Sequence, residues 1–163
     1  MNALWAYFWP LFALGLVAGG IFGTVWLRRK RPAILAAGAA LTLAGTALWH
    51  GPLGAGDRFA AQVETAARTA LVDWEMPQVQ ARLNRGPLTR RLRLSGPADD
   101  FQRSELVRIM GAVPGASGAS WSEAPGTPLL LEAALVSTLG FLLGLLLAYG
   151  VELRRRYNAE WKW

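Results

Sequence analysis

The single histidine of this 163-residue chain is the first residue whose type and position could support chemistry. His50 ends an apolar stretch, precedes Gly51-Pro52, and has the small residues Thr46 and Ala47 one helical turn before it. Small residues at that spacing allow a haem or chlorophyll macrocycle to approach a histidine on a membrane helix. His50 is therefore a candidate pigment ligand, and the alternative is an interfacial histidine that meets water at a helix end.

Glu132 is the second candidate, because it is the one charged residue in the apolar stretch 129–151. Ionisable residues inside a membrane are functional candidates by default. Its position about one turn from the start of the stretch favours a solvated acid at a helix N-terminus, where the helix dipole stabilises negative charge. A proton relay needs titratable partners at depth, and the apolar stretches offer no other carboxylate, histidine or basic residue at depth.

Other catalytic or metal-binding arrangements are not indicated. The chain has no cysteine, which excludes disulfides, thiolate metal sites and a cysteine nucleophile. One histidine and sparse carboxylates disfavour a multi-ligand zinc or iron site. No Gly-rich phosphate loop, Ser-His-Asp set or pair of catalytic carboxylates can be assigned. We therefore expect a protein that is not an enzyme and has no cofactor beyond a peripheral pigment or lipid contact.

Three apolar stretches are the elements that must position these residues. The chain is 53% hydrophobic and 17% charged, whereas soluble domains carry about 25% charged residues. Residues 4–27 and 129–151 are long enough to cross a hydrocarbon core of about 30 Å, and residues 33–50 lie at the short end of that range. Residues 4–27 are too long for a signal peptide, and their basic cluster follows the apolar run. The sequence predicts three transmembrane helices and a small α+β domain.

The net charge of +6 belongs mainly to the flanks of these stretches. The loop 28–32 carries +4 and the tail 152–163 carries +2, whereas the segment 57–127 carries only +1. Nucleic-acid binding therefore lacks its electrostatic signature. Basic clusters beside spans stay cytoplasmic, which predicts an outer amino terminus, an outer central domain and a cytoplasmic carboxyl terminus. The residues expected to anchor the chain are Arg28, Arg29, Lys30, Arg31, Arg154, Arg155, Arg156, Trp161 and Trp163.

Arginine supplies fifteen of the seventeen basic residues, and alanine and glycine are abundant. This composition is typical of a GC-rich bacterial genome, so the membrane is expected to be a bacterial inner membrane and the outer side a periplasm.

Small residues recur every four positions on two of the apolar stretches. Such faces allow helix backbones to approach closely. They are expected to pack either on each other or on a partner protein. The residues are Gly15, Gly19 and Gly23 on the first stretch, and Gly140, Gly144 and Ala148 on the third.

The central segment alternates between helical and strand periodicity. Asp57 is expected to cap a helix that ends near Leu71. Two alternating stretches, 79–83 and 91–95, predict strands joined by a turn. Asp99 with Gln102 predicts a capping box at the start of a second helix, and a short strand ending at Trp121 follows. The predicted order is αββαβ, with both helices on one face of a small sheet.

Two glycine motifs of this segment resemble those of the BON domain family. They are Leu92-Arg93-Leu94-Ser95-Gly96-Pro97-Ala98 before the second helix and Val113-Pro114-Gly115 after it. The resemblance covers residues 57–122. It implies a small αββαβ module of bacterial envelope proteins that binds phospholipid surfaces or other proteins and has no catalytic residues.

Arginines concentrate on the predicted hairpin, where Arg91 and Arg93 share one strand face. This face either docks on lipid phosphates or an acidic partner, or is a solvated face balanced by nearby acids. Together these features predict a non-catalytic accessory subunit of a larger bacterial inner-membrane complex, photosynthetic or respiratory, that braces integral membrane subunits and contacts lipids. The alternative is a stand-alone envelope protein whose BON-like domain binds lipid or another envelope component.

Overall fold

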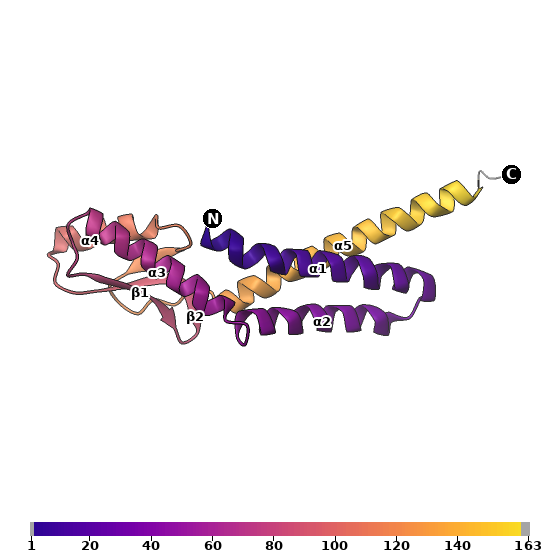
Figure 1. Cartoon of the computed structure of the whole chain (residues 1–163), viewed down its shortest axis with the longest axis horizontal. Coiled ribbons are helices and arrows are strands. Elements are labelled where there is room, and N and C mark those ends of the chain that lie inside the picture. Colours follow the sequence, from indigo (N-terminus) through magenta and orange to yellow (C-terminus); the bar gives the residue numbers. More distant parts are fainter. Residues whose placement is uncertain (1, 161–163) are drawn as a thin grey trace. The chain divides into compact units, whose positions relative to one another are not determined.

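The computed structural model describes residues 2–160 and contains five helices and a three-stranded sheet (Figure 1). Three helices are long and apolar enough to cross a membrane, namely α1 (Ala3–Arg29), α2 (Pro32–His50) and α5 (Leu129–Glu160). The predicted combination of three such helices with a small sheet is confirmed. The chain forms two compact units, and we call them the helical unit and the α+β unit. The helical unit comprises residues 8–53 and 133–160, and the α+β unit comprises residues 2–7 and Gly54–Glu132.

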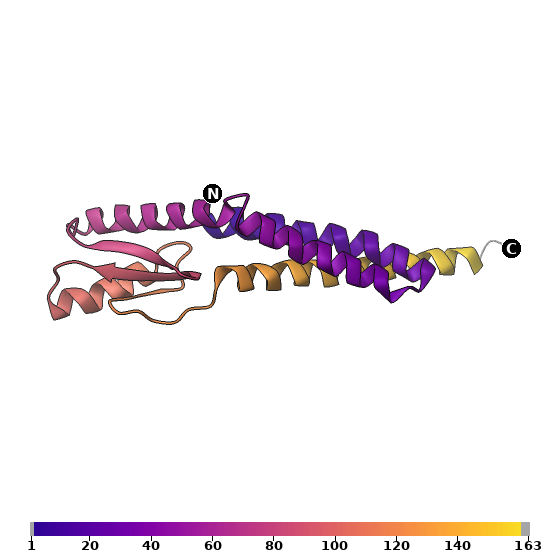
Figure 2. The ribbon, with the colours of Figure 1, turned by 90° about the horizontal axis from the view of Figure 1, so that it is seen from below.

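In the helical unit, α1 and α2 form an antiparallel hairpin. Only Lys30 and Arg31 connect them, and Lys30 adopts a left-handed backbone with φ of 54°. The glycine contacts give the direction of α5, because Gly15 lies against Ser137 and Gly23 lies near Ala148. Positions along the two helices therefore increase together, and α5 runs parallel to α1, as Figure 2 shows from a second side.

The third apolar helix continues beyond the apolar residues. α5 has 32 residues, which corresponds to about 48 Å at 1.5 Å per residue. The hydrocarbon core needs only about 30 Å. Glu152 lies 3.8 Å from Arg155 and 3.3 Å from Arg156, and ion pairs at these i,i+3 and i,i+4 spacings stabilise a helix. Residues 152–160, expected as a separate tail, therefore continue the helix.

The α+β unit has the predicted αββαβ order. It consists of α3 (Ala55–Asp73), β1 (Gln80–Arg85), β2 (Leu88–Ser95), α4 (Asp100–Gly111) and β3 (Gly118–Ser120). The sheet order is β1-β2-β3, with β1 antiparallel and β3 parallel to β2.

The register gives this sheet one buried face. Leu83 lies opposite Leu92, and Leu92 lies opposite Ala119, so these buried side chains point to the same side. Both helices bury apolar residues, and we infer that they cover this face, with α3 against β1 and α4 against β3. The largest buried side chains of the two helices are Phe59, Val63, Leu71, Leu106 and Met110.

Of the two N-caps predicted from sequence, the one of α4 is observed and the one of α3 is not. The capping box of α4 is confirmed, because Asp99 Oδ1 accepts from the Gln102 N–H at 2.7 Å and Gln102 Oε1 accepts from the Asp99 N–H at 3.1 Å. The prediction that Asp57 caps α3 is wrong. The helix begins at Ala55, and its N-cap is Gly54, which takes a left-handed backbone with φ of 69°. Asp57 instead lies in the first turn, 3.5 Å from Arg85.

The α+β unit extends beyond the predicted boundaries 57–122. Tyr7, from the second turn of α1, packs on Phe59 with 5.4 Å between ring centroids. At the other end, Thr89 of β2 forms an isolated β-bridge with Pro128. Contacts between residues so far apart in sequence leave no local pattern, so periodicity alone does not reveal them.

Candidate functional site

A groove of about 840 Å³ lies between α3 and β1 in the α+β unit. Its wall on α3 includes Thr65, Arg68 and Val72, and its wall on β1 includes Ala81 and Arg82. β1 is an edge strand of the sheet. The groove therefore runs along a strand edge, which is where an extended segment can add to a sheet.

Hydrogen bonding shows which backbone groups of β1 face the groove. The Leu83 N–H donates to Glu64 Oε1 of α3 at 3.0 Å. In an antiparallel pair, residues alternate between those that bond the neighbouring strand and those that point away from it. Leu83 points away from β2, so Ala81, two residues earlier, presents its N–H and C=O to the groove as well.

The groove carries a positive charge. Its charged lining residues are Arg68, Arg82, Arg85 and Glu64. Glu64 Oε2 already accepts from Arg85 at 3.0 Å, and its other oxygen holds the Leu83 N–H. Arg68 and Arg82 are exposed and remain at the rim of the groove. An acidic side chain would therefore find complementary charge beside the open strand edge.

The hairpin arginines are held by the chain itself. Arg93 donates to Glu123 Oε1 at 2.7 Å, and Arg91 donates to the carbonyl of Pro125 at 3.0 Å. We call residues 121–128 the strap, because they lie along the outer, polar face of β2. The two residues proposed from sequence as a docking surface therefore fix the strap, although Arg93 stays exposed and Arg91 is only half-buried.

Glu132 has a partner that the sequence did not reveal. Arg90 Nε lies 3.2 Å from Glu132 Oε2, and the two side chains are only 22% and 24% exposed. Arg90 alternates with Arg91 and Arg93, so it points to the other face of β2 and reaches the start of α5. The ion pair ties the middle strand of the sheet to the first turn of α5. Glu132 therefore has a structural partner within the α+β unit.

His50 is the last residue of α2 and is half-buried. One turn earlier, Thr46 is buried against α5, and its Oγ1 lies at hydrogen-bonding distance from Thr42 O at 2.9 Å and from Ser137 Oγ at 3.0 Å. Ala47 is exposed. A macrocycle that approached His50 would therefore have to lie over Ala47, because α5 covers the Thr46 side.

The two small-residue stripes pack on each other. A Cβ added at Gly15 would overlap the Ser137 carbonyl oxygen, and one added at Gly144 would overlap that of Leu16. Gly19 and Gly140 make equivalent approaches to Phe141 and Phe12, and Gly23 lies beside Ala148. We call this contact the glycine seam. Since the seam is closed within the chain, its stripes are not available to a partner protein.

The two basic clusters lie at the same end of the helical unit. α1 and α5 are parallel, and Gly23 lies beside Ala148, so the end of α1 at Arg28 and Arg29 comes level with the turn of α5 that begins at Glu152. Lys30 lies 5.4 Å from the centre of the Trp26 ring. Trp161 and Trp163 lie outside the described residues.

Among the side chains of residues 2–159, which the structure describes, no group of three or more His, Asp or Glu is placed to hold a metal ion. No protein-family model, curated protein or solved structure matches the chain.

Proposed function

We propose that the chain is a non-catalytic accessory protein of a larger bacterial inner-membrane complex, and that its α+β unit holds a partner protein at the membrane. α1, α2 and α5 would cross the membrane, as their length and apolar character allow. The basic clusters at one end of the helical unit would lie in the cytoplasm, and the α+β unit would lie in the periplasm.

The observation that carries this proposal is the groove between α3 and β1. It combines an open strand edge at Ala81 with exposed guanidinium groups from Arg68 and Arg82. These features suit an extended segment with acidic side chains. Its backbone would pair with Ala81, and its carboxylates would meet the two arginines.

The surface of the three apolar helices suits contact with lipid or with neighbouring helices, and not recognition of an acidic segment. The glycine seam occupies the small-residue faces of α1 and α5. The remaining surface of α5 is rich in exposed leucine, including Leu139, Leu142 and Leu146. Such a surface suits acyl chains as well as neighbouring helices. Bracing of partner subunits through the membrane helices would use this surface, whereas recognition is better assigned to the groove.

The second candidate is a stand-alone envelope protein whose BON-like module binds lipid. The αββαβ order supports this likeness, as do the left-handed backbones of Gly96 and Gly115, with φ of 129° and 102°. The lipid-binding part relied on the hairpin arginines. Because Arg91 and Arg93 already donate to the strap, we favour protein docking in the groove.

Binding of a defined peptide to the full chain in phosphatidylcholine nanodiscs tests the proposal. The probe is an eight-residue peptide of alternating glutamate and valine. We expect it to slow hydrogen exchange of the Ala81 amide, because that N–H would become bonded to the added strand. A peptide with proline at its central positions cannot donate from those positions and should give no protection.

Charge reversal supplies the matched control. Arg68→Glu with Arg82→Glu should weaken peptide binding by about tenfold or more, whereas Arg58→Glu with Arg108→Glu removes the same charge outside the groove and should leave binding nearly unchanged. The proposal fails if Ala81 stays unprotected, or if an alternating lysine-valine peptide binds as tightly.

A further inference from the structure

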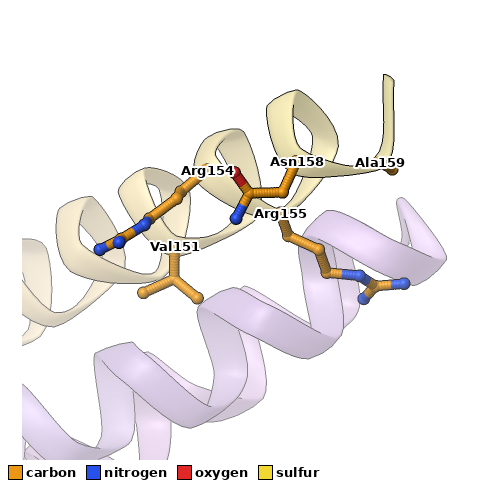
Figure 3. A pocket seen from close by; sticks show the side chains of 5 residues that line it. All are labelled: Val151, Arg154, Arg155, Asn158 and Ala159. Carbon is orange, nitrogen blue, oxygen red and sulfur yellow. The ribbon is translucent and has the colours of Figure 1, made fainter. Parts of the chain in front are cut away.

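A hollow of about 430 Å³ lies on the last turns of α5 (Figure 3). It is lined by Val151, Arg154, Arg155, Asn158 and Ala159. In Figure 3, Val151 lies between the side chains of Arg154 and Arg155, which leave the helix in different directions. The lining of the hollow thus combines an apolar side chain with two arginines.

The hollow continues the glycine seam. Gly140, Gly144 and Ala148 recur every four residues on α5, and the same face continues through residues 151–152 and 155. α1 covers this face as far as Gly23, which lies beside Ala148, and α1 itself ends at Arg29. Past that point α5 extends without α1 beside it.

The polar groups of the hollow suit a phosphate diester. Arg154 makes no ion pair with any side chain that the structure describes, which are those of residues 2–159. Glu152 Oε1 accepts from Arg156 at 3.3 Å, whereas Arg155 stands 3.8 Å from the other carboxylate oxygen. Arg155 is therefore only loosely held and can turn to an anion. The Asn158 amide adds a neutral donor.

Charge at this end of the helical unit strengthens the attraction for an anion. The loop cluster Arg28, Arg29, Lys30 and Arg31 lies at the same end as Arg154, Arg155 and Arg156. In sequence, Glu152 and Glu160 are the acidic residues that accompany these clusters. Basic pockets at the cytoplasmic end of membrane helices bind anionic lipid headgroups.

We infer that this hollow binds the phosphate of an anionic glycerophospholipid, with Arg154 and Arg155 on the headgroup and an acyl chain beside Val151. A lipid fits better than a free phosphate, because the apolar stretch 129–151 ends at the hollow and an acyl chain would run along α5. The inference rests on the membrane insertion proposed above.

Native mass spectrometry of the full chain tests the site. The protein is purified in mild detergent with equal amounts of phosphatidylglycerol and phosphatidylcholine, and the bound lipids are counted. We expect preferential retention of phosphatidylglycerol, lowered about tenfold by Arg154→Gln with Arg155→Gln. The matched control, Arg28→Gln with Arg29→Gln, removes two charges at the same end but outside the hollow, and it should lower retention much less.

Three results would overturn the site. If both double variants lost phosphatidylglycerol to the same extent, the lipid would be attracted by the overall positive charge of this end and not by the hollow. Equal retention of both lipids would show that the phosphate charge is not recognised, and displacement of phosphatidylglycerol by millimolar glycerol 1-phosphate would assign the hollow to a free phosphate ester. Reconstitution followed by alkaline extraction measures insertion separately. A chain that resists extraction and yet shows no lipid preference refutes the lipid site and leaves the proposed function standing.

Discussion

Single glycines determine whether α1 and α5 can touch. At Gly144 the backbone carbonyl of Leu16 occupies the space that a side chain would need. At Gly150 on the same helix, nothing beyond its chain neighbours and the nearby backbone of its own helix lies within 4 Å of that position. In lipid, apolar burial gives no preference for helix association, so close backbone packing must supply it.

This difference predicts opposite outcomes for two identical substitutions. Gly144→Ala should lower the free energy of unfolding by about 1–3 kcal/mol, because the helices must separate to admit the methyl group. Gly150→Ala should leave it unchanged or raise it by up to about 1 kcal/mol through helix propensity. Reversible unfolding of the full chain in micelles measures both, and equal effects would contradict the seam.

At the scale of elements, β2 organises the α+β unit because its two faces hold different partners. Arg90 on one face reaches Glu132, and Arg91 and Arg93 on the other face hold the strap through Pro125 and Glu123. Neighbouring residues on a strand point to opposite sides, so three arginines within four positions serve two separate contacts.

The strap predicts that Arg93→Gln and Glu123→Gln behave alike. Either change breaks the same ion pair, whose side chains are 56% and 79% exposed. The loss of stability should be about 0–1 kcal/mol, and hydrogen exchange should accelerate in residues 121–128. Both variants should remain bound to the proposed partner complex to the same extent. If Arg93→Gln alone detached the protein from that complex, Arg93 would be a docking residue and not only a partner of Glu123.

At the scale of the whole molecule, the parallel course of α1 and α5 places the basic clusters at one end of the helical unit. A three-span path requires this arrangement, because both clusters must reach the same side of the membrane. The two clusters are independent in sequence, and each would favour the cytoplasm by itself.

Cysteine labelling checks this orientation, and the chain contains no native cysteine to interfere. Gly86→Cys, whose new side chain meets open space, should react with a membrane-impermeant maleimide in intact spheroplasts. Asn158→Cys should react only after permeabilisation. Gly118 at the start of β3 is also on the α+β unit, but it is a poor site for a labelling cysteine because its φ of 156° disfavours any side chain. Labelling of Asn158→Cys in intact spheroplasts would contradict the proposed topology.

The sequence by itself determined the features that depend on neighbouring residues. Apolar runs predicted the three long helices, alternation predicted β1 and β2, and Asp99 with Gln102 predicted the start of α4. These features are local, since helix and strand periods and capping bonds act within a few positions. Asp57 failed as a cap, because a glycine in left-handed backbone began the helix earlier.

Only the tertiary structure decided which partner each surface meets. It closed the two small-residue stripes on each other, joined Glu132 to Arg90, placed the strap on Arg91 and Arg93, and exposed the edge of β1 beside α3. Each of these outcomes joins residues distant in the chain. A stripe of small residues or a charged side chain indicates only that a contact is possible. Which partner makes that contact depends on helix direction and strand register, and these arise only when the whole chain packs.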